Sequence, residues 1–159
     1  MSAAPQSSPP TADLFQPSDY RMCESVGYLI TRARSLIGHG VEQEVSELDI
    51  TQAQASCLMA LANGSARTVT DLGRELATDM GSVTRLLSRM EKRGLIERHR
   101  RDADRRVVDL VVTPLGHELV AKLPAVFCRV LSHHFRGFSE DEINTLRAFL
   151  HRMIDNNSG

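Results

Sequence analysis

Apolar residues recur every three or four positions along most of this chain, which is the period of an α-helix. Ser18 can cap a first long helix, and Thr113 followed by Pro114 can begin a later one, in which Pro124 predicts a kink. Three other starts carry Ser or Thr with Gln, Asp or Glu three residues on, the pattern of a capping box. They stand at Thr51, Thr68 and Ser139. The pattern predicts a mainly α-helical protein.

One stretch, from residue 79 to residue 116, departs from this uniform pattern. It begins with a predicted helix that has Asp79 as its N-cap and Gly94 as its left-handed end. The apolar side of this helix consists of Val83, Leu86, Leu87 and Met90. Beyond Gly94 the period changes from 3.6 to 2, and Val108, Leu110 and Val112 share one face. We therefore expect a helix, a strand, a charged tip and a returning strand.

The same stretch concentrates positive charge. Residues 85–106 contain nine Lys or Arg and four acids, a net charge of +5 in a chain whose total is −1. A charge run alone is more often a solvated surface, but here it follows a helix with a small, polar and basic outer side. That side carries Ser82, Thr84, Arg85, Ser88 and Arg89. This order of elements is typical of a winged helix-turn-helix, which sets one helix in the major groove of DNA and a hairpin beside it.

Four segments at these spacings resemble the MarR family of bacterial transcriptional regulators. They are Val83-Thr-Arg-Leu-Leu, Glu91-Lys-Arg-Gly-Leu-Ile-Glu-Arg98, Asp104-Arg-Arg106 and Thr113-Pro-Leu-Gly116. The resemblance covers roughly residues 20–155. It implies a mainly α fold with a small β-hairpin wing, in which the N- and C-terminal helices build a dimerisation region.

The resemblance also implies roles for particular residues. Arg105 and Arg106 would contact DNA from the wing, with Asp104 as their brace, and Arg105→Ala would weaken specific binding more than about tenfold. The five polar and basic residues on the outer side of the helix are candidates for base edges and phosphates. General attraction to phosphate would come from Arg98, Arg100 and Arg101. The family often has an acid and a proline where Arg101, Asp102 and Ala103 stand, so this tip is more basic.

The expected domains follow from the same reading. Residues 1–17, rich in Pro, Ser and Ala, form a flexible tail; residues 18–46 and 114–156 form the helical dimerisation region; residues 47–113 form the winged domain. A twofold dimer would hold two recognition helices about 34 Å apart, one turn of DNA, and would require a palindromic operator. We expect a homodimer that binds double-stranded DNA.

MarR-like regulators commonly bind aromatic carboxylates or phenols, and the ligand usually weakens DNA binding. Arg32 and Arg34 flank opposite edges of the apolar stripe on the first helix, so either could bind a carboxylate. The alternative is a pair of surface arginines with packed stems. The expected function is a repressor released by a small aromatic acid, with a hydroxylated benzoate or pyridine carboxylate as the ligand class.

Other functions remain open alternatives or are disfavoured. A thiol-based regulator would use Cys23, although this residue lies about one turn too early and lacks partner tyrosines near the second helix; a winged-helix module could also bind protein. Cys128, His133, His134 and His151 lack the spacing of a metal site. We found no catalytic motif, so we expect no enzyme, no cofactor and no metal. The chain has no membrane span or signal peptide, which predicts a cytoplasmic protein.

Overall fold

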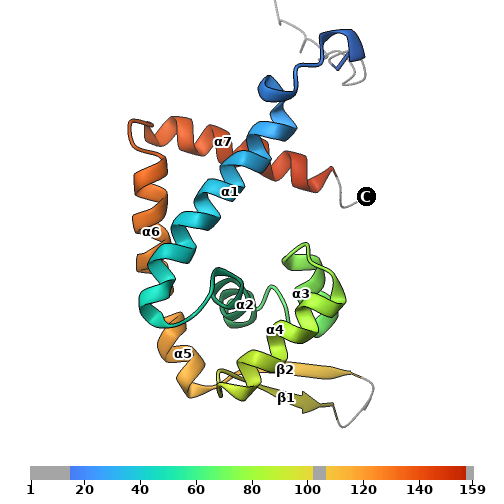
Figure 1. The fold of residues 1–159 in the computed structure, drawn as a ribbon, viewed down its shortest axis with the longest axis vertical. Coiled ribbons are helices and arrows are strands. Elements are labelled where there is room, and N and C mark those ends of the chain that lie inside the picture. The colour runs from blue at the N-terminus through green and yellow to red at the C-terminus, as the bar shows by residue number, and fades with distance from the viewer. Residues whose placement is uncertain (1–14, 102–106, 157–159) are drawn as a thin grey trace, which may run out of the picture. The chain divides into compact units, whose positions relative to one another are not determined.

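The computed structural model describes residues 15–101 and 107–156 of the chain (Figure 1). These residues divide into two compact units, with the boundary between Leu36 and Ile37. This division differs from the predicted three-part organisation, whose boundaries at residues 17, 46 and 113 stay predictions. Each unit is described separately below.

The first unit contains two short 3₁₀ turns, Pro17–Asp19 and Met22–Glu24, and the beginning of helix α1, Val26–Val45. The prediction that Ser18 caps this helix was wrong. The cap is Ser25, whose Oγ accepts a hydrogen bond from the backbone N–H of Tyr28 at 3.2 Å. Both residues are serines ahead of an apolar repeat, so the local pattern alone did not separate them.

The second unit begins within α1 and contains the remaining elements. A 3₁₀ turn, Ser46–Leu48, leads to α2, Gln52–Ala62, α3, Val69–Glu75, and α4, Met80–Lys92. The hairpin β1, Ile96–Arg100, and β2, Val108–Val112, follows. The chain ends with α5, Pro114–Val120, α6, Leu123–His134, and α7, Glu140–Asp155. This is the expected mainly α fold with a two-stranded wing.

Most helix starts of this unit are set by side chains, as the sequence predicted, whereas α6 begins without a side-chain cap. Thr51, Thr68 and Ser139 each form both halves of a capping box with the residue three positions on. The prediction that Pro124 kinks one continuous helix was wrong. Two helices stand there: α5 ends at Val120, and Pro124 lies near the start of α6, where no intrahelical N–H is needed.

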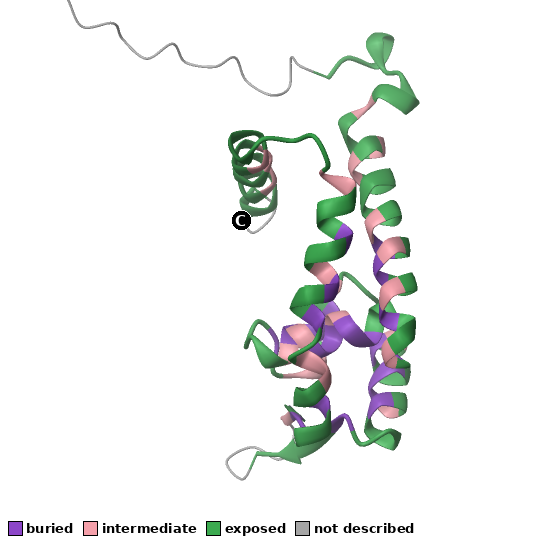
Figure 2. Ribbon diagram, turned by 90° about the vertical axis from the view of Figure 1, so that its left-hand side faces the viewer, coloured by how far each residue is buried: buried purple, intermediate pink, exposed green. Residues whose placement is uncertain are grey.

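The core lies where α2, α3, α4 and the hairpin meet, with contributions from the end of α1 and from α6 (Figure 2). Its largest fully buried side chains are Leu58, Leu72, Leu87, Met90, Ile96 and Leu123. Burying a side chain of this size stabilises the fold by about 1.5–3 kcal/mol. Because Leu87 and Met90 come from α4, the same core fixes the inner side of that helix.

The wing is an antiparallel hairpin that is closed at its base. Ile96 pairs with Val112 and Arg100 with Val108. Thr113 Oγ1 donates to the carbonyl of Gly94 at 2.6 Å and accepts from the N–H of Gly116 at 3.1 Å. A Cβ on Gly116 would lie 2.3 Å from the carbonyl oxygen of Leu95, so only glycine allows this approach. The two ends of the hairpin are thereby joined to each other and to α5.

No helix in the described part of the chain is long and apolar enough to cross a membrane.

Candidate nucleic-acid interface

Helix α4 has one buried side and one exposed side, as its sequence predicted. Val83, Leu86, Leu87 and Met90 are buried. Asp79 caps the helix, since its Oδ1 accepts the N–H of Ser82 at 2.9 Å. The side-chain and backbone hydrogen bonds from Ser82 lower the pKa of this carboxyl group. The outer side is therefore presented on a helix that is fixed by packing and by its cap.

The five predicted contact residues lie together on this outer side. Thr84, Arg85 and Arg89 are exposed, and Ser82 and Ser88 are half-buried. Arg85 Nη2 donates to Ser82 Oγ at 2.9 Å, which holds its guanidinium near the start of the helix. Arg89 has no side-chain hydrogen bond or ion pair with any described residue. Two guanidinium groups and three hydroxyls on one helical face can meet phosphates and base edges in a groove.

The hydroxyls of Thr84 and Ser88 already donate to backbone carbonyls of their own helix. Thr84 Oγ1 donates to Met80 O at 2.8 Å, and Ser88 Oγ donates to Thr84 O at 3.0 Å. Each oxygen still has acceptor capacity. Because their hydroxyl hydrogens are already used within the helix, these two side chains are better placed to accept hydrogen bonds than to donate them.

The arginines of the hairpin differ in their partners, which the count of charges could not reveal. Arg98 Nε lies 3.4 Å from Glu91 Oε2. Arg101 donates two hydrogen bonds of 2.7 Å to Asp109, and this guanidinium lowers the pKa of the aspartate. Arg100 is exposed and forms no side-chain ion pair with a described residue. Of the three predicted phosphate-attracting residues, Arg100 is the one whose charge has no acidic partner among the residues that the structure describes.

The predicted wing contacts Asp104, Arg105 and Arg106 lie outside the described residues, as does Asp102. Their roles stay predictions.

The candidate ligand residues belong to the first unit. Arg32 and Arg34 are exposed on α1, and Arg32 Nη1 donates to the hydroxyl of Tyr28 at 3.2 Å. Cys23 is exposed in the 3₁₀ turn before α1, and not on the helix itself. Cys57 is buried in α2, which raises the pKa of its thiol to about 12. The described residues contain no cluster of three or more His, Cys, Asp or Glu that could hold a metal ion.

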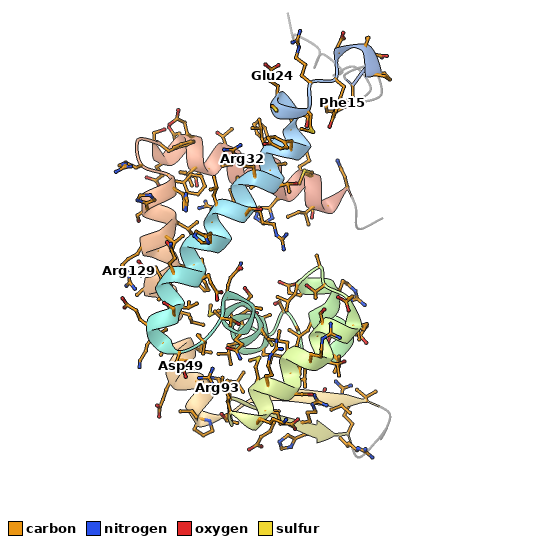
Figure 3. All side chains as sticks on the ribbon, in the orientation of Figure 1. Phe15, Glu24, Arg32, Asp49, Arg93 and Arg129 are labelled. Carbon is orange, nitrogen blue, oxygen red and sulfur yellow. The ribbon has the colours of Figure 1, made fainter. Side chains whose placement is uncertain are left out.

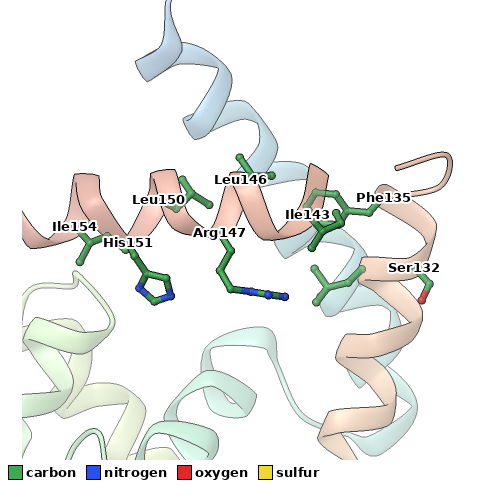
Figure 4. A pocket seen from close by; sticks show the side chains of 9 residues that line it. Ser132, Phe135, Ile143, Leu146, Arg147, Leu150, His151 and Ile154 are labelled. Atoms are coloured by element: carbon green, nitrogen blue, oxygen red, sulfur yellow. The ribbon is translucent and has the colours of Figure 1, made fainter. Parts of the chain in front are cut away.

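An apolar groove of about 490 Å³ lies between α6 and α7 (Figure 4). Two of its polar members, Arg147 and His151, extend from α7 on the same side of that helix. The rest of the lining is mainly aliphatic or aromatic. It comprises Leu131, Ser132, Phe135, Ile143, Leu146, Leu150 and Ile154. The sequence pattern indicated the apolar stripes on these two helices but not the groove that they form together.

These elements define a winged helix-turn-helix protein: α3, the turn after it and α4 are the helix-turn-helix, and the hairpin is the wing. A model of the MarR family matches residues 48–107. The transcriptional regulator SarZ of Staphylococcus haemolyticus is 30% identical over 109 residues, which are 69% of this chain and 73% of that protein. The chain belongs to the MarR family of winged-helix transcriptional regulators, which are not enzymes.

Solved structures agree with this assignment. A structure of Bordetella bronchiseptica BpsR, whose DNA binding is regulated by 6-hydroxynicotinic acid, is 28% identical, with a TM-score of 0.75 over 86% of this chain and 97% of that one. A mutant of Escherichia coli MarR in complex with operator DNA is 26% identical, with a TM-score of 0.72 over 80% of this chain and 92% of that one.

Proposed function

We propose that this regulator is a repressor that binds a palindromic operator as a homodimer and is released by a small aromatic carboxylate or phenol. The observation that carries the proposal is the outer side of α4, where Arg85 and Arg89 stand among hydroxyl side chains on a helix fixed by its core. The E. coli relative of similar fold was solved with operator DNA. Because a protein dimer is twofold symmetric, the operator should be an inverted repeat.

Exposed apolar residues at both ends of the chain support the homodimer. On α1, Val26, Leu29 and Leu36 are half or more exposed, and on α7 so are Phe149 and Ile154. Apolar surface of this extent on consecutive turns of a helix usually marks an interaction site. A second copy of the chain would remove this surface from water.

The aromatic acid is supported by the Bordetella relative, whose DNA binding responds to a hydroxylated pyridine carboxylate. Release of the operator by the ligand follows from the coupling between the two binding equilibria. A ligand that binds better to a dimer with wrongly spaced recognition helices must weaken operator binding, and the operator must weaken ligand binding equally. Arg32 and Arg34 remain the candidate carboxylate partners.

The test is fluorescence anisotropy with duplex DNA from upstream of the protein's own gene, over a salt series. The affinity should exceed that for random duplex and fall steeply with salt. A panel of benzoates, salicylates and pyridine carboxylates is then added, and at least one should release the DNA. Equal affinity for random duplex, both here and after selection from a random pool, would contradict the proposal and favour a protein-binding module.

A further inference from the structure

Arg93 lies in the basic stretch of the sequence, but its side chain is directed toward another part of the fold (Figure 3). It is the C-cap residue of α4. Its Nη1 donates to the backbone carbonyl of Asp49 at 2.5 Å and lies 3.5 Å from Gln54 Oε1. Its Nη2 donates to Asp49 Oδ2 at 3.0 Å. The guanidinium thus joins the end of α4 to residues that are 39 and 44 positions away.

Asp49 occupies the turn that connects α1 with α2. It has a left-handed backbone, with φ of 54°, and its N–H donates to Ser46 O at 3.0 Å. Gln54 is buried, and its Oε1 also accepts the N–H of Thr51, which is the N-cap of α2. Arg93 therefore contacts a residue in the connection between α1 and α2 and a member of the capping box of α2.

Two further contacts join the end of α1, which precedes this turn, to α2 and to α6. Glu42, near the end of α1, accepts the N–H of Gln52 at 2.5 Å. Glu44 forms an ion pair with Arg129 of α6, with Nη2 2.8 Å from Oε2. The end of α1, the start of α2 and α6 thus form one connected frame, and Arg93 attaches α4 to it.

We propose that Arg93 is a positioning residue for DNA binding, which sets the direction of α4 relative to this frame and does not contact phosphate. The inference rests on the proposed function. A helix of 13 residues is about 20 Å long, so a tilt of about 10° at its C-terminal end moves its N-terminal end by about 3 Å. That displacement is comparable to the length of a hydrogen bond, so it is large enough to break contacts with DNA. It would also change the spacing of the two recognition helices in a dimer.

This role concerns orientation more than stability. The side chain of Asp49 is 98% exposed and that of Arg93 is 36% exposed. Ion pairs at such exposure contribute little to the free energy of unfolding. The guanidinium nevertheless donates to specific acceptors, and one of them, Gln54, is buried. Removal of the guanidinium should leave the chain folded, but the C-terminal end of α4 would no longer be held in one orientation relative to the frame.

Substitution of Asp49 distinguishes this role from a phosphate contact, because the two roles predict opposite changes in DNA affinity. If Arg93 bound phosphate, Asp49→Asn would remove a competing carboxylate and a negative charge, so DNA would bind equally well or more tightly. If Arg93 positions α4, Asp49→Asn weakens specific binding. Asparagine is chosen because it tolerates the left-handed backbone of this residue. Glu47→Gln, an exposed acid in the same connection, is the matched control.

The measurement is anisotropy of the full-length protein on a duplex that the wild type has selected from a random pool, and on random duplex. We expect Asp49→Asn and Arg93→Gln each to weaken binding of the selected duplex about fivefold, with Glu47→Gln near wild type. The double variant should be no weaker than Arg93→Gln, since both changes break one interaction. Binding of random duplex by Asp49→Asn should be unchanged, which loss of folded protein would not produce.

Tighter or unchanged binding of the selected duplex by Asp49→Asn overturns the inference while the proposed function stands. Additive losses in the double variant also overturn it. Failure of the wild type to select any duplex would instead remove the proposed function, and this inference with it. Thermal unfolding of each variant within a few degrees of wild type verifies that folded proteins are compared.

Discussion

The positive charge that α4 and the hairpin present is decided by the partners of single side chains. Arg98, Arg101 and Arg93 each lie beside a carboxylate, whereas Arg89 and Arg100 have no acidic partner among the described residues. A guanidinium that already lies beside a carboxylate has part of its charge compensated, so it adds less to the attraction for phosphate. The unpaired ones need only lose water and counterions.

We therefore predict that Arg89→Ala weakens operator binding about tenfold and lowers the slope of log affinity against log salt by about one. Arg98→Ala, which removes a side chain already paired with Glu91, should lower the slope by less. Both variants are measured by anisotropy over the same salt series. Equal slopes in the two variants would mean that pairing in the free protein does not govern the DNA contacts.

At this scale the sequence allowed only part of the site to be predicted. The outer side of α4 could be predicted because helical spacing places Ser82, Arg85 and Arg89 together. The partners of Arg93 could not, because Asp49 is distant in the sequence and has no pattern that indicates contact. The sequence predicted that Arg101 attracts phosphate but could not predict its pairing with Asp109, which depends on how the two strands are aligned.

Most helices in the described part of this protein begin at a residue whose side chain caps the first turn. Asp79 holds the start of α4 by accepting the N–H of Ser82, and Thr51, Thr68 and Ser139 act in the same way at other helices. Such signals are local, so the sequence predicted four of these starts. It misplaced the start of α1, where two serines compete, and it merged α5 with α6 because both continue one apolar stripe.

The cap of α4 should depend on pH. The pKa of Asp79 is lowered in the folded protein from an ordinary value near 3.8, so the stabilisation is present above that pH and is lost as pH falls through the folded value. Asp79→Ser keeps an oxygen acceptor that does not titrate. In urea unfolding, we expect this variant to match wild type at pH 7 and to lose less stability between about pH 5 and pH 3.

The control for this prediction is Glu118→Gln, which removes an exposed carboxylate of α5 that forms no side-chain hydrogen bond with a described residue. It should follow wild type throughout the acid range. If Asp79→Ser does the same, the cap does not contribute to acid sensitivity.

At the scale of the whole molecule, the end helices expose apolar faces that the proposed homodimer would cover. The sequence predicted these faces, since each is a stripe at helical spacing, but the shape of the groove between α6 and α7 depends on how two helices pack. The winged helix-turn-helix could be predicted from the order of elements, and the place of the end helices in the fold was implied by the family resemblance. The arrangement of two copies could not be predicted, because the stripes show which faces are apolar but not how the faces of two chains would meet.

We predict that Ile154→Glu, at the edge of the groove, converts the proposed dimer into a monomer at micromolar concentration, since a charged carboxylate would have to leave water within a mainly apolar surface. Thr145→Glu, on the same helix but outside the groove, should remain dimeric. Light scattering after size-exclusion chromatography gives the mass of each variant. A dimeric Ile154→Glu would show that the groove is not part of the interface.

The closed base of the hairpin has a consequence for how this fold can diverge. The hydroxyl of Thr113 joins Gly94 to Gly116, and Arg101 N–H bonds to the carbonyl of Val107 at the far end of the strands. Both ends of the ladder are thus held by residues outside the segment 102–106. Selection can therefore exchange or lengthen that segment without altering the scaffold, so descendants of one ancestral regulator can acquire new target sequences while they inherit the same frame.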